Sequence, residues 1–506
     1  MKPITLWERM GLWWTSRAST PMAGMRSACG VFDSRPSRLT LLIWIGGTFC
    51  VGLAGYLNIG FVAMDDYSQV VRYVIPFQHH SVSEAIATSG IRSPVPVLFL
   101  RELLHPFAAL GMESPVLQLR TLLVLLGLGS FTTLFVVAGW PKALPPSLVL
   151  PFRCLAFLFV LMPFVSTRPM YEALSTPWFF LSCASVSIYT QKKKVPWILF
   201  ALFTLTVASV LRPQCGIALP VLVFSVLALP SQAERGKHLV WVLGAALALF
   251  LLTGFLDLWL KGSFHASLKN YVVENYEISS TYGKTSPLMA IALLLGLTLP
   301  PTFFSRYPGF SWKQAYGVLW PYWGYAGIFF LAHAVIPHKE ERFFIPMIPL
   351  LLVLFIPALR FFWSHSGMRW RVYYFWSVNS LLWIPASYFV AQNNVIGLVQ
   401  YLNHHPEIKS VKIVSDKYLM VPEVLLACSV SLQQTLAQWP TGPGTCDTLV
   451  VTQPHKLGLR GKGYAQVAAA YPNILEQFMV WANPGQNLRR AATLAFLPQR
   501  CLQNQD

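Results

Sequence analysis

Long apolar runs separated by short polar loops make up most of this chain. A helix that crosses the hydrocarbon core of a bilayer needs roughly 20 predominantly apolar residues. Read at that length, the pattern predicts about eleven membrane-spanning helices. The predicted spans cover residues 39–62, 116–137, 148–166, 173–189, 195–211, 216–229, 239–257, 288–304, 317–335, 344–359 and 372–390.

The basic residues indicate how these helices are oriented, because Lys and Arg are enriched in cytoplasmic loops. Before the first apolar run, six basic residues stand against two acidic ones, which predicts a cytoplasmic N-terminus. Counting forward, the basic loops at 192–194, 234–237 and 369–371 fall on the same side. The luminal or periplasmic side then receives the segments 63–115, 167–172, 261–287 and 338–343 and the C-terminal tail. We therefore expect any chemistry on that face.

The pattern changes after residue 392. Short β-like runs at 411–414, 448–452 and 493–497 are separated by turns rich in Pro and Gly, such as residues 440–444. This alternation predicts a small mixed α/β domain outside the membrane. The predicted organisation is a cytoplasmic N-terminal segment (1–38), a transmembrane region (39–392) and a non-cytoplasmic C-terminal domain (393–506).

Composition supports an all-α polytopic membrane protein. The chain is 55% hydrophobic and 11% charged, with a mean hydropathy of +0.51, whereas soluble domains carry about 25% charged residues. The net charge of +18 reflects the basic cytoplasmic loops, and no basic arm with interleaved aromatic residues predicts a nucleic-acid partner. The first apolar run lacks a convincing cleavage site for a signal peptide and is interpreted as a retained helix.

The cysteines predict no metal site, because those in or near the spans have no metal-ligand spacing. Three more lie in the predicted outer tail: Cys428, Cys446 and Cys501. An oxidising compartment would allow one disulfide among them, and the sequence does not select the pair.

The most informative polar segment is residues 338–343 (HKEERF), where five consecutive ionisable residues stand between two apolar runs. Charges at the edge of a bilayer are costly unless they pair, reach water or bind a ligand. Arg168 and Arg212 also lie at span ends on the predicted outer side. A single arginine there is usually a snorkelling anchor, but several together fit a lipid phosphate or diphosphate. Glu340 and Glu341 either pair with the neighbouring bases or orient one of them toward a ligand.

A second polar segment, Asp65-Asp66, follows the first span directly. One interpretation is a helix cap with an acidic first turn. The functional interpretation is a general base that removes the proton of an acceptor hydroxyl as its oxygen attacks an electrophilic carbon. A third is a site for a divalent ion. The loop also contains His79, His80 and Arg92, and loops of this length are usually functional or disordered.

Residues 337–343 (PHKEERF), with the proline-rich apolar helix after them, resemble the Pro-His-Lys-Glu-x-Arg-Phe signature of glycosyltransferase family 22. This family comprises mannosyltransferases that use polyprenyl-phosphate sugars in N-glycan and GPI-anchor assembly. Other resemblances follow in the family's order over roughly residues 40–365. Residues 65–69 (DDYSQ) resemble the family's Asp-Glu-x-x-Gln loop, residues 91–93 (IRS) its Leu-Arg-Ser, and residues 211–213 (LRP) its Arg-Pro. Asp257, followed by Tyr282-Gly283, resembles its Asp…Tyr-Gly-x-His-Pro loop.

The chain departs from the family pattern at several positions. The family's Asp-Glu is Asp65-Asp66 here, and residues 284–287 lack the histidine before proline. The family's Arg-Thr-Leu-Ser-Asn-x-x-Glu-Thr run corresponds to residues 168–176 (RPMYEALST), in which its glutamate has moved or been lost. The tail matches no part of the family pattern. These departures leave the acceptor, and in part the sugar, open.

The resemblance implies a GT-C helical bundle and inverting sugar transfer without a metal or other cofactor. It implies that Asp65 is the catalytic base with Asp66 beside it, and that the basic residues neutralise the departing donor phosphate. The implied phosphate-binding residues are His338, Lys339, Arg342 and Arg212, and the implied supporting residues are Glu341, Arg92, Arg168 and Tyr282.

Our leading hypothesis is a mannosyltransferase that uses a polyprenyl- or dolichyl-phosphate donor and a lipid-linked or glycan acceptor. It would act on the luminal face of the endoplasmic reticulum membrane or on the periplasmic face of a bacterial inner membrane, with membrane lipid around it. The alternative is a transporter or flippase of lipid-linked saccharides, which predicts polar residues through the span centres, and few occur there. A purely structural membrane subunit would leave residues 338–343 without a purpose.

Overall fold

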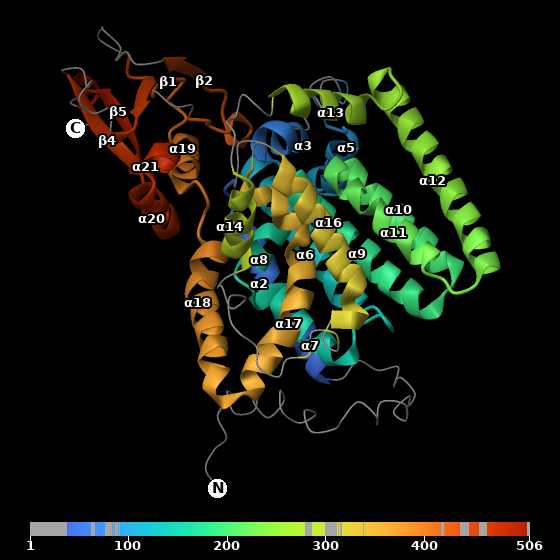
Figure 1. The fold of residues 1–506 in the computed structure, drawn as a ribbon. Helices are drawn as coiled ribbons and strands as arrows, with labels where there is room; N and C mark the ends of the chain where they lie inside the picture. The colour runs from blue at the N-terminus through green and yellow to red at the C-terminus, as the bar shows by residue number, and fades with distance from the viewer. Residues whose placement is uncertain are drawn as a thin grey trace. The chain divides into compact units, whose positions relative to one another are not determined.

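The computed structural model describes residues 38–61, 66–75, 83, 86, 90, 92–278, 286–298, 311, 313, 316–336, 339–415, 419–435, 445–454 and 463–502. The chain forms two compact units (Figure 1). The first unit comprises Met1–Cys50, Gly129–Met162 and Tyr171–Trp383. The second comprises Val51–Leu128, Pro163–Met170 and Ile384–Asp506, so the predicted C-terminal domain belongs to a larger unit that includes earlier segments.

Among its described residues, the first unit contains helices and helical turns and no strand. Its helices are α7 (Pro146–Leu158), α9 (Tyr171–Lys192), α10 (Val195–Leu211), α11 (Leu219–Leu227), α12 (Gln232–Lys261), α13 (Ala266–Ile278), α14 (Pro287–Thr298), α16 (Trp320–Val335) and α17 (Ile348–Ser364). Short helical turns are η3 (Pro213–Ala218), η5 (Gly317–Leu319), η6 (Glu341–Met347) and η7 (Ser366–Met368). The chain passes between the units within α2 (Arg38–Leu57), α6 (Pro115–Ala138), α8 (Leu161–Ser166) and α18 (Arg369–Tyr388).

Four helical runs in the described part of the chain are long and apolar enough to cross a membrane: Arg38–Leu57, Pro115–Ala138, Gln232–Lys261 and Glu341–Ser364. Every predicted span contains helix, but several helices are short or broken. The span at 148–166, for example, is divided into α7 and α8 where the Val160 amide donates to Asn379 Oδ1 at 3.1 Å. The number of membrane crossings therefore remains a prediction.

Helix α9 lies in the core of the first unit, and its small polar residues allow close packing. Ser182 Oγ donates to the Ala201 carbonyl of α10 at 2.7 Å and lies 2.7 Å from the Tyr325 hydroxyl of α16. Small residues at helix interfaces let backbones approach closely, which favours association of helices inside a membrane. In the same unit, α9 also contacts η6, and α10 contacts η3.

Helix α12 is largely exposed, in contrast to the buried helix α9. Ser231 caps its N-terminus by accepting a bond from the Glu234 amide, and Gly262 ends it at a φ of +75°, a conformation that favours glycine. Most of its large apolar side chains are exposed, including Val240, Leu252 and Trp259. Figure 1 shows this long helix beside α10 and α11, on which it packs with one side.

The second unit contains a five-stranded sheet with short helices. Its strands are β1 (Ser410–Val414), β2 (Ser431–Thr435), β3 (Thr448–Thr452), β4 (Tyr464–Ala470) and β5 (Thr493–Pro498). Its helical elements are η2 (Asp66–Val71), α3 (Arg72–Val74), α5 (Val95–Ala109), α19 (Asn393–His404), η8 (Glu423–Leu425), α20 (Ile474–Ala482), α21 (Pro484–Asn487), η10 (Leu488–Arg490) and η11 (Gln499–Cys501).

The strand order is β2-β1-β3-β5-β4. β1 pairs in parallel with β2 and β3, whereas β5 is antiparallel to both β3 and β4. The three predicted β runs are confirmed as β1, β3 and β5. The other two strands lie at the edges of the sheet, and the sequence pattern did not predict them.

One apolar core joins this sheet to the segment after α2. Val411 and Val451 of the sheet and Val399 of α19 are buried in the same cluster as Tyr67 and Leu119. The Val424 amide also donates to the Tyr67 hydroxyl at 3.5 Å. The residues that follow Asp66 are therefore held by the C-terminal domain, which no local pattern in the sequence predicted.

A disulfide joins Cys446 to Cys501, which closes the C-terminal end of the chain against the start of β3. Cys428 is a free, exposed cysteine. The structure thus confirms one bridge among the three tail cysteines and selects the pair.

Candidate active site

Arg212 is positioned by the proline that follows it. The residue before a proline is disfavoured in the α region, and Arg212 is extended with a φ of −142° as α10 ends at Leu211. Its guanidinium is buried and its Nη1 forms an ion pair with Glu172 Oε1 in the first turn of α9. Its Nε and Nη2 are also buried and have no hydrogen-bond acceptor among the described residues.

The Phe343 ring packs against the arginine of this ion pair. The Phe343 ring centroid lies 5.2 Å from Arg212 Cζ and 5.6 Å from Arg342 Cζ. The ring of His333, in the last turn of α16, lies 6.4 Å from that of Phe343. His333 Nδ1 donates to the Phe329 carbonyl at 2.8 Å, and its buried Nε2 has no partner within the described part of the chain. Phe343 thus places both arginines and His333 in one region of the first unit.

The described residues of the HKEERF segment make local contacts. Lys339 is buried and its Nζ donates to the Ile336 carbonyl at 2.5 Å. Glu340 pairs with Arg342 at 2.5 Å, which agrees with the interpretation that this acid neutralises a neighbouring base. Glu341 begins η6 and is exposed. His338 lies outside the described residues.

The second unit holds Asp66 and Arg168. Asp66 is fully buried at the start of η2. Arg168 is fully buried as well: its Nη2 donates to the Asn58 carbonyl at 2.8 Å, its Nη1 to the Gly60 carbonyl, and its Nε to the Phe164 carbonyl at 3.3 Å. Burial lowers the pKa of Arg168 to about 10, and the negative charge of Asp66 opposes this shift.

These contacts give Arg168 a structural task. It satisfies the carbonyls that are left without intrahelical partners at the end of α2, just before Asp65 and Asp66. Asp65 itself lies outside the described residues.

Replacement of Arg168 by Met is expected to lower the free energy of unfolding by about 2–4 kcal/mol, because two buried carbonyls lose a charged donor. Binding of polyprenyl phosphate, the ligand that the family resemblance implies, should not depend on Arg168, since all three guanidinium nitrogens are directed at the backbone. Thermal midpoints with and without polyprenyl phosphate measure both quantities. A stable variant that loses the ligand-induced shift would instead make Arg168 a phosphate ligand.

The remaining predicted site residues are less informative. Arg92 is half-buried in the second unit, ahead of α5, where Ser93 Oγ accepts a bond from the Val95 amide at 3.4 Å. Tyr282 lies outside the described residues. Asp257 of α12 accepts bonds from the Ser267 amide and hydroxyl at 2.8 and 2.9 Å, which joins α12 to α13. Among the described residues, no group of three or more His, Cys, Asp or Glu side chains could hold a metal ion.

Comparison with known proteins identifies the family. The sequence profile of the Alg9-like mannosyltransferase family matches residues 67–420, which is most of the chain. The chain belongs to this family. The predicted resemblance to glycosyltransferase family 22 is thereby confirmed.

Individual relatives match less completely. GPI mannosyltransferase 3 of Yarrowia lipolytica is 29% identical over 224 residues, which cover 42% of this chain and 40% of that relative. Two crystal structures of ArnT from Cupriavidus metallidurans, one bound to undecaprenyl phosphate and one in the apo state, cover 91% of this chain and 98% of their own. Each has a TM-score of 0.49 and 10% sequence identity.

In this mannosyltransferase-family chain, Arg212 and Arg342 are brought together around Phe343, and Lys339 belongs to the same unit. Asp66, Arg92 and Arg168 belong to the other unit. Sequence reasoning missed two residues near Arg212. Glu172 was considered displaced from the family pattern, although it pairs with Arg212. The second is His333, which lies inside an apolar helix. A histidine among apolar residues was the sequence signal that could have marked it as a site residue.

Proposed function

We propose that this protein transfers mannose, with inversion, from a polyprenyl- or dolichyl-phosphate donor to a lipid-linked or glycan acceptor on the non-cytoplasmic face. The observation that carries the proposal is the Arg212 guanidinium. Two of its nitrogens are buried and find no acceptor in the described part of the chain. Buried donors of this kind are costly unless an acceptor is supplied, and phosphate oxygens suit the planar fork of arginine.

In the proposed reaction, an acidic residue activates the acceptor and basic residues stabilise the leaving phosphate. Asp65 removes the proton of the acceptor hydroxyl, and the oxygen forms a bond to the anomeric carbon of mannose. The bond from that carbon to the phosphate oxygen breaks on the opposite side, and polyprenyl phosphate leaves with the electron pair. His338, Lys339, Arg342 and Arg212 would stabilise the charge that develops on this phosphate.

Glu172 limits how Arg212 can act. Its carboxylate holds Nη1 and leaves Nε and Nη2 for a ligand. The pair also lowers the cost of keeping a guanidinium buried before the donor binds. We infer that Glu172 orients Arg212 toward the donor phosphate.

The protein purified into nanodiscs is expected to form a new glycosidic bond when given polyprenyl-phosphate mannose and a lipid-linked acceptor. Release of one polyprenyl phosphate for each mannose transferred would support the reaction, and polyprenyl-phosphate glucose serves as the matched control for the sugar. Translocation of a labelled lipid-linked saccharide without a new bond would instead support the transporter. Cells lacking the protein should accumulate the lipid-linked glycan that is one sugar shorter than the product. The structure of that glycan would identify the acceptor.

A further inference from the structure

Helix α20 (Ile474–Ala482) carries an exposed apolar face. Ile474, Phe478 and Trp481 are spaced at i, i+4 and i+7, so they share one side of the helix. They are 62%, 60% and 77% exposed, and Tyr471, just before the helix, is 61% exposed. Contiguous exposed apolar surface of this kind marks an interaction site.

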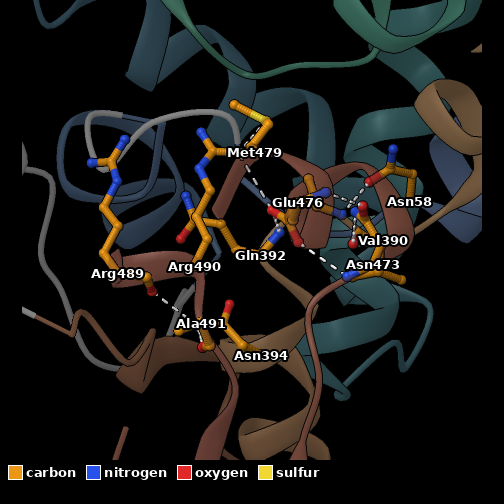
Figure 2. A network of polar contacts seen from close by, with 11 residues as sticks. Asn58, Val390, Gln392, Asn394, Asn473, Glu476, Met479, Arg489, Arg490 and Ala491 are labelled. Carbon is orange, nitrogen blue, oxygen red and sulfur yellow. Dashed lines mark hydrogen bonds and ion pairs between the residues drawn. The ribbon is translucent and has the colours of Figure 1, made fainter. Parts of the chain in front are cut away.

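The opposite side of α20 is anchored to the rest of the second unit. Glu476 is buried there and forms a capping box with Asn473. Figure 2 shows Glu476 accepting from the Gln392 amide at 2.6 Å and Asn473 Nδ2 donating to the Val390 carbonyl at 2.8 Å. Asn393 Nδ2 also donates to the Tyr471 carbonyl at 2.8 Å. The helix therefore starts against residues 390–393.

Those residues are bonded in turn to the end of α2. Asn58 follows the last residue of this membrane-spanning candidate. Its Oδ1 accepts from the Ala391 amide at 2.9 Å, and its Nδ2 donates to the Ala386 and Ser387 carbonyls at 3.2 and 3.3 Å. A Cβ on Gly60 would overlap the Ala391 carbonyl, so the two backbone segments lie in close contact.

We propose that the apolar face of α20 inserts into the lipid surface of the bilayer at the level where α2 ends. The chain of bonds from α2 through Ala391 to Glu476 holds the helix at that depth, and every residue in it belongs to the second unit. Amphipathic helices lie in the interfacial region with aromatic residues toward the acyl chains, and Trp is enriched at that level. Leu57, Ile384 and Phe389, which are close in sequence to the residues of these anchoring bonds, are also exposed.

Fluorescence quenching of a site-specific label in nanodiscs that hold one protein copy tests this inference. Both proteins compared carry serine in place of Cys29, Cys50 and Cys154, so that the remaining free cysteines other than the labelled one are buried. A Phe478→Cys/Cys428→Ser variant on this background carries an environment-sensitive dye on the apolar face, and the background protein carries the same dye on exposed Cys428. The dye at residue 478 is expected to be quenched by doxyl-labelled lipid and protected from aqueous iodide. The dye on Cys428 is expected to respond to iodide and little to the lipid quencher.

Equal access of iodide to both positions would overturn the proposal. Protection of residue 478 from both quenchers would also overturn it, since the face would then be covered by protein. A Trp481→Cys/Cys428→Ser variant repeats the measurement and keeps the test decisive if the first variant does not fold. A lipid-exposed dye at residue 478 or 481 supports the inference. This result does not depend on which sugar the protein transfers.

Discussion

Replacement of Asp65 by Asn is expected to reduce the turnover rate of mannose transfer by about 10²–10⁴-fold, the usual contribution of a general base. Asn has nearly the same shape but does not accept a proton at neutral pH. The value of KM for the acceptor should change little, because asparagine has nearly the same size as aspartate and keeps a polar side chain. Initial rates with polyprenyl-phosphate mannose across pH measure the effect, and the acidic limb of the rate profile should disappear in the variant.

Asp66→Asn is the matched control. Asp66 is fully buried, and its negative charge acts on Arg168. Its neutralisation should therefore lower the thermal midpoint, whereas Asp65→Asn should leave the midpoint unchanged. Full activity in Asp65→Asn would remove this residue as the base. A folded but inactive Asp66→Asn protein would transfer that role to its neighbour.

Replacement of Glu172 by Gln is expected to lower the free energy of unfolding by about 3–5 kcal/mol, because it leaves the buried charge of Arg212 without its counter-ion. Transfer should fall as well, since Nη1 loses the carboxylate that orients the guanidinium. Thermal midpoints by size exclusion and initial rates measure the two effects in the same preparations.

The double variant Glu172→Gln/Arg212→Met separates stability from function. Removing both charges should restore much of the stability, because no buried charge is then left without a counter-ion. Transfer should be lost in the double variant, because no guanidinium is left at residue 212 to neutralise the departing phosphate. Recovery of activity together with stability would show that Arg212 has a structural task only.

The Glu476–Arg490 pair provides a control for the effect of breaking an ion pair. Glu476 is buried, and its Oε1 lies 3.4 Å from Arg490 Nη1 in the second unit. Arg490→Met should lower the thermal midpoint modestly without affecting the rate of transfer. A large loss of activity in this variant would mean that instability alone explains the effects at Glu172.

Much of this fold was predictable because its signals are local. Apolar runs near the length of a bilayer predicted helices at positions where the structure contains them, and the β-branched runs became β1, β3 and β5. The edge strands were not predictable in this way. β2 (SLQQT) is polar and β4 (YAQVAAA) is rich in alanine, so both depend on pairing with a neighbouring strand rather than on their own propensity.

The site residues were likewise predictable where their signal is local, and their distant partners were not. A short contiguous motif, residues 337–343, identified the family and its basic residues from the sequence alone. The partners of those residues could not be identified, because Glu172 and Arg212 are 40 positions apart and Arg168 reaches carbonyls 108 and 110 positions away.

By itself, the sequence determined the membrane class, the family, most helices and the segments that carry charge, since each follows from neighbouring residues. Only the tertiary structure decided that Glu172 holds Arg212, that Arg168 supports the backbone after α2, and that Cys446 pairs with Cys501. Each of these contacts joins distant positions whose local patterns are compatible with several partners. Packing selects one of them, because a buried charge or carbonyl without a partner is costly.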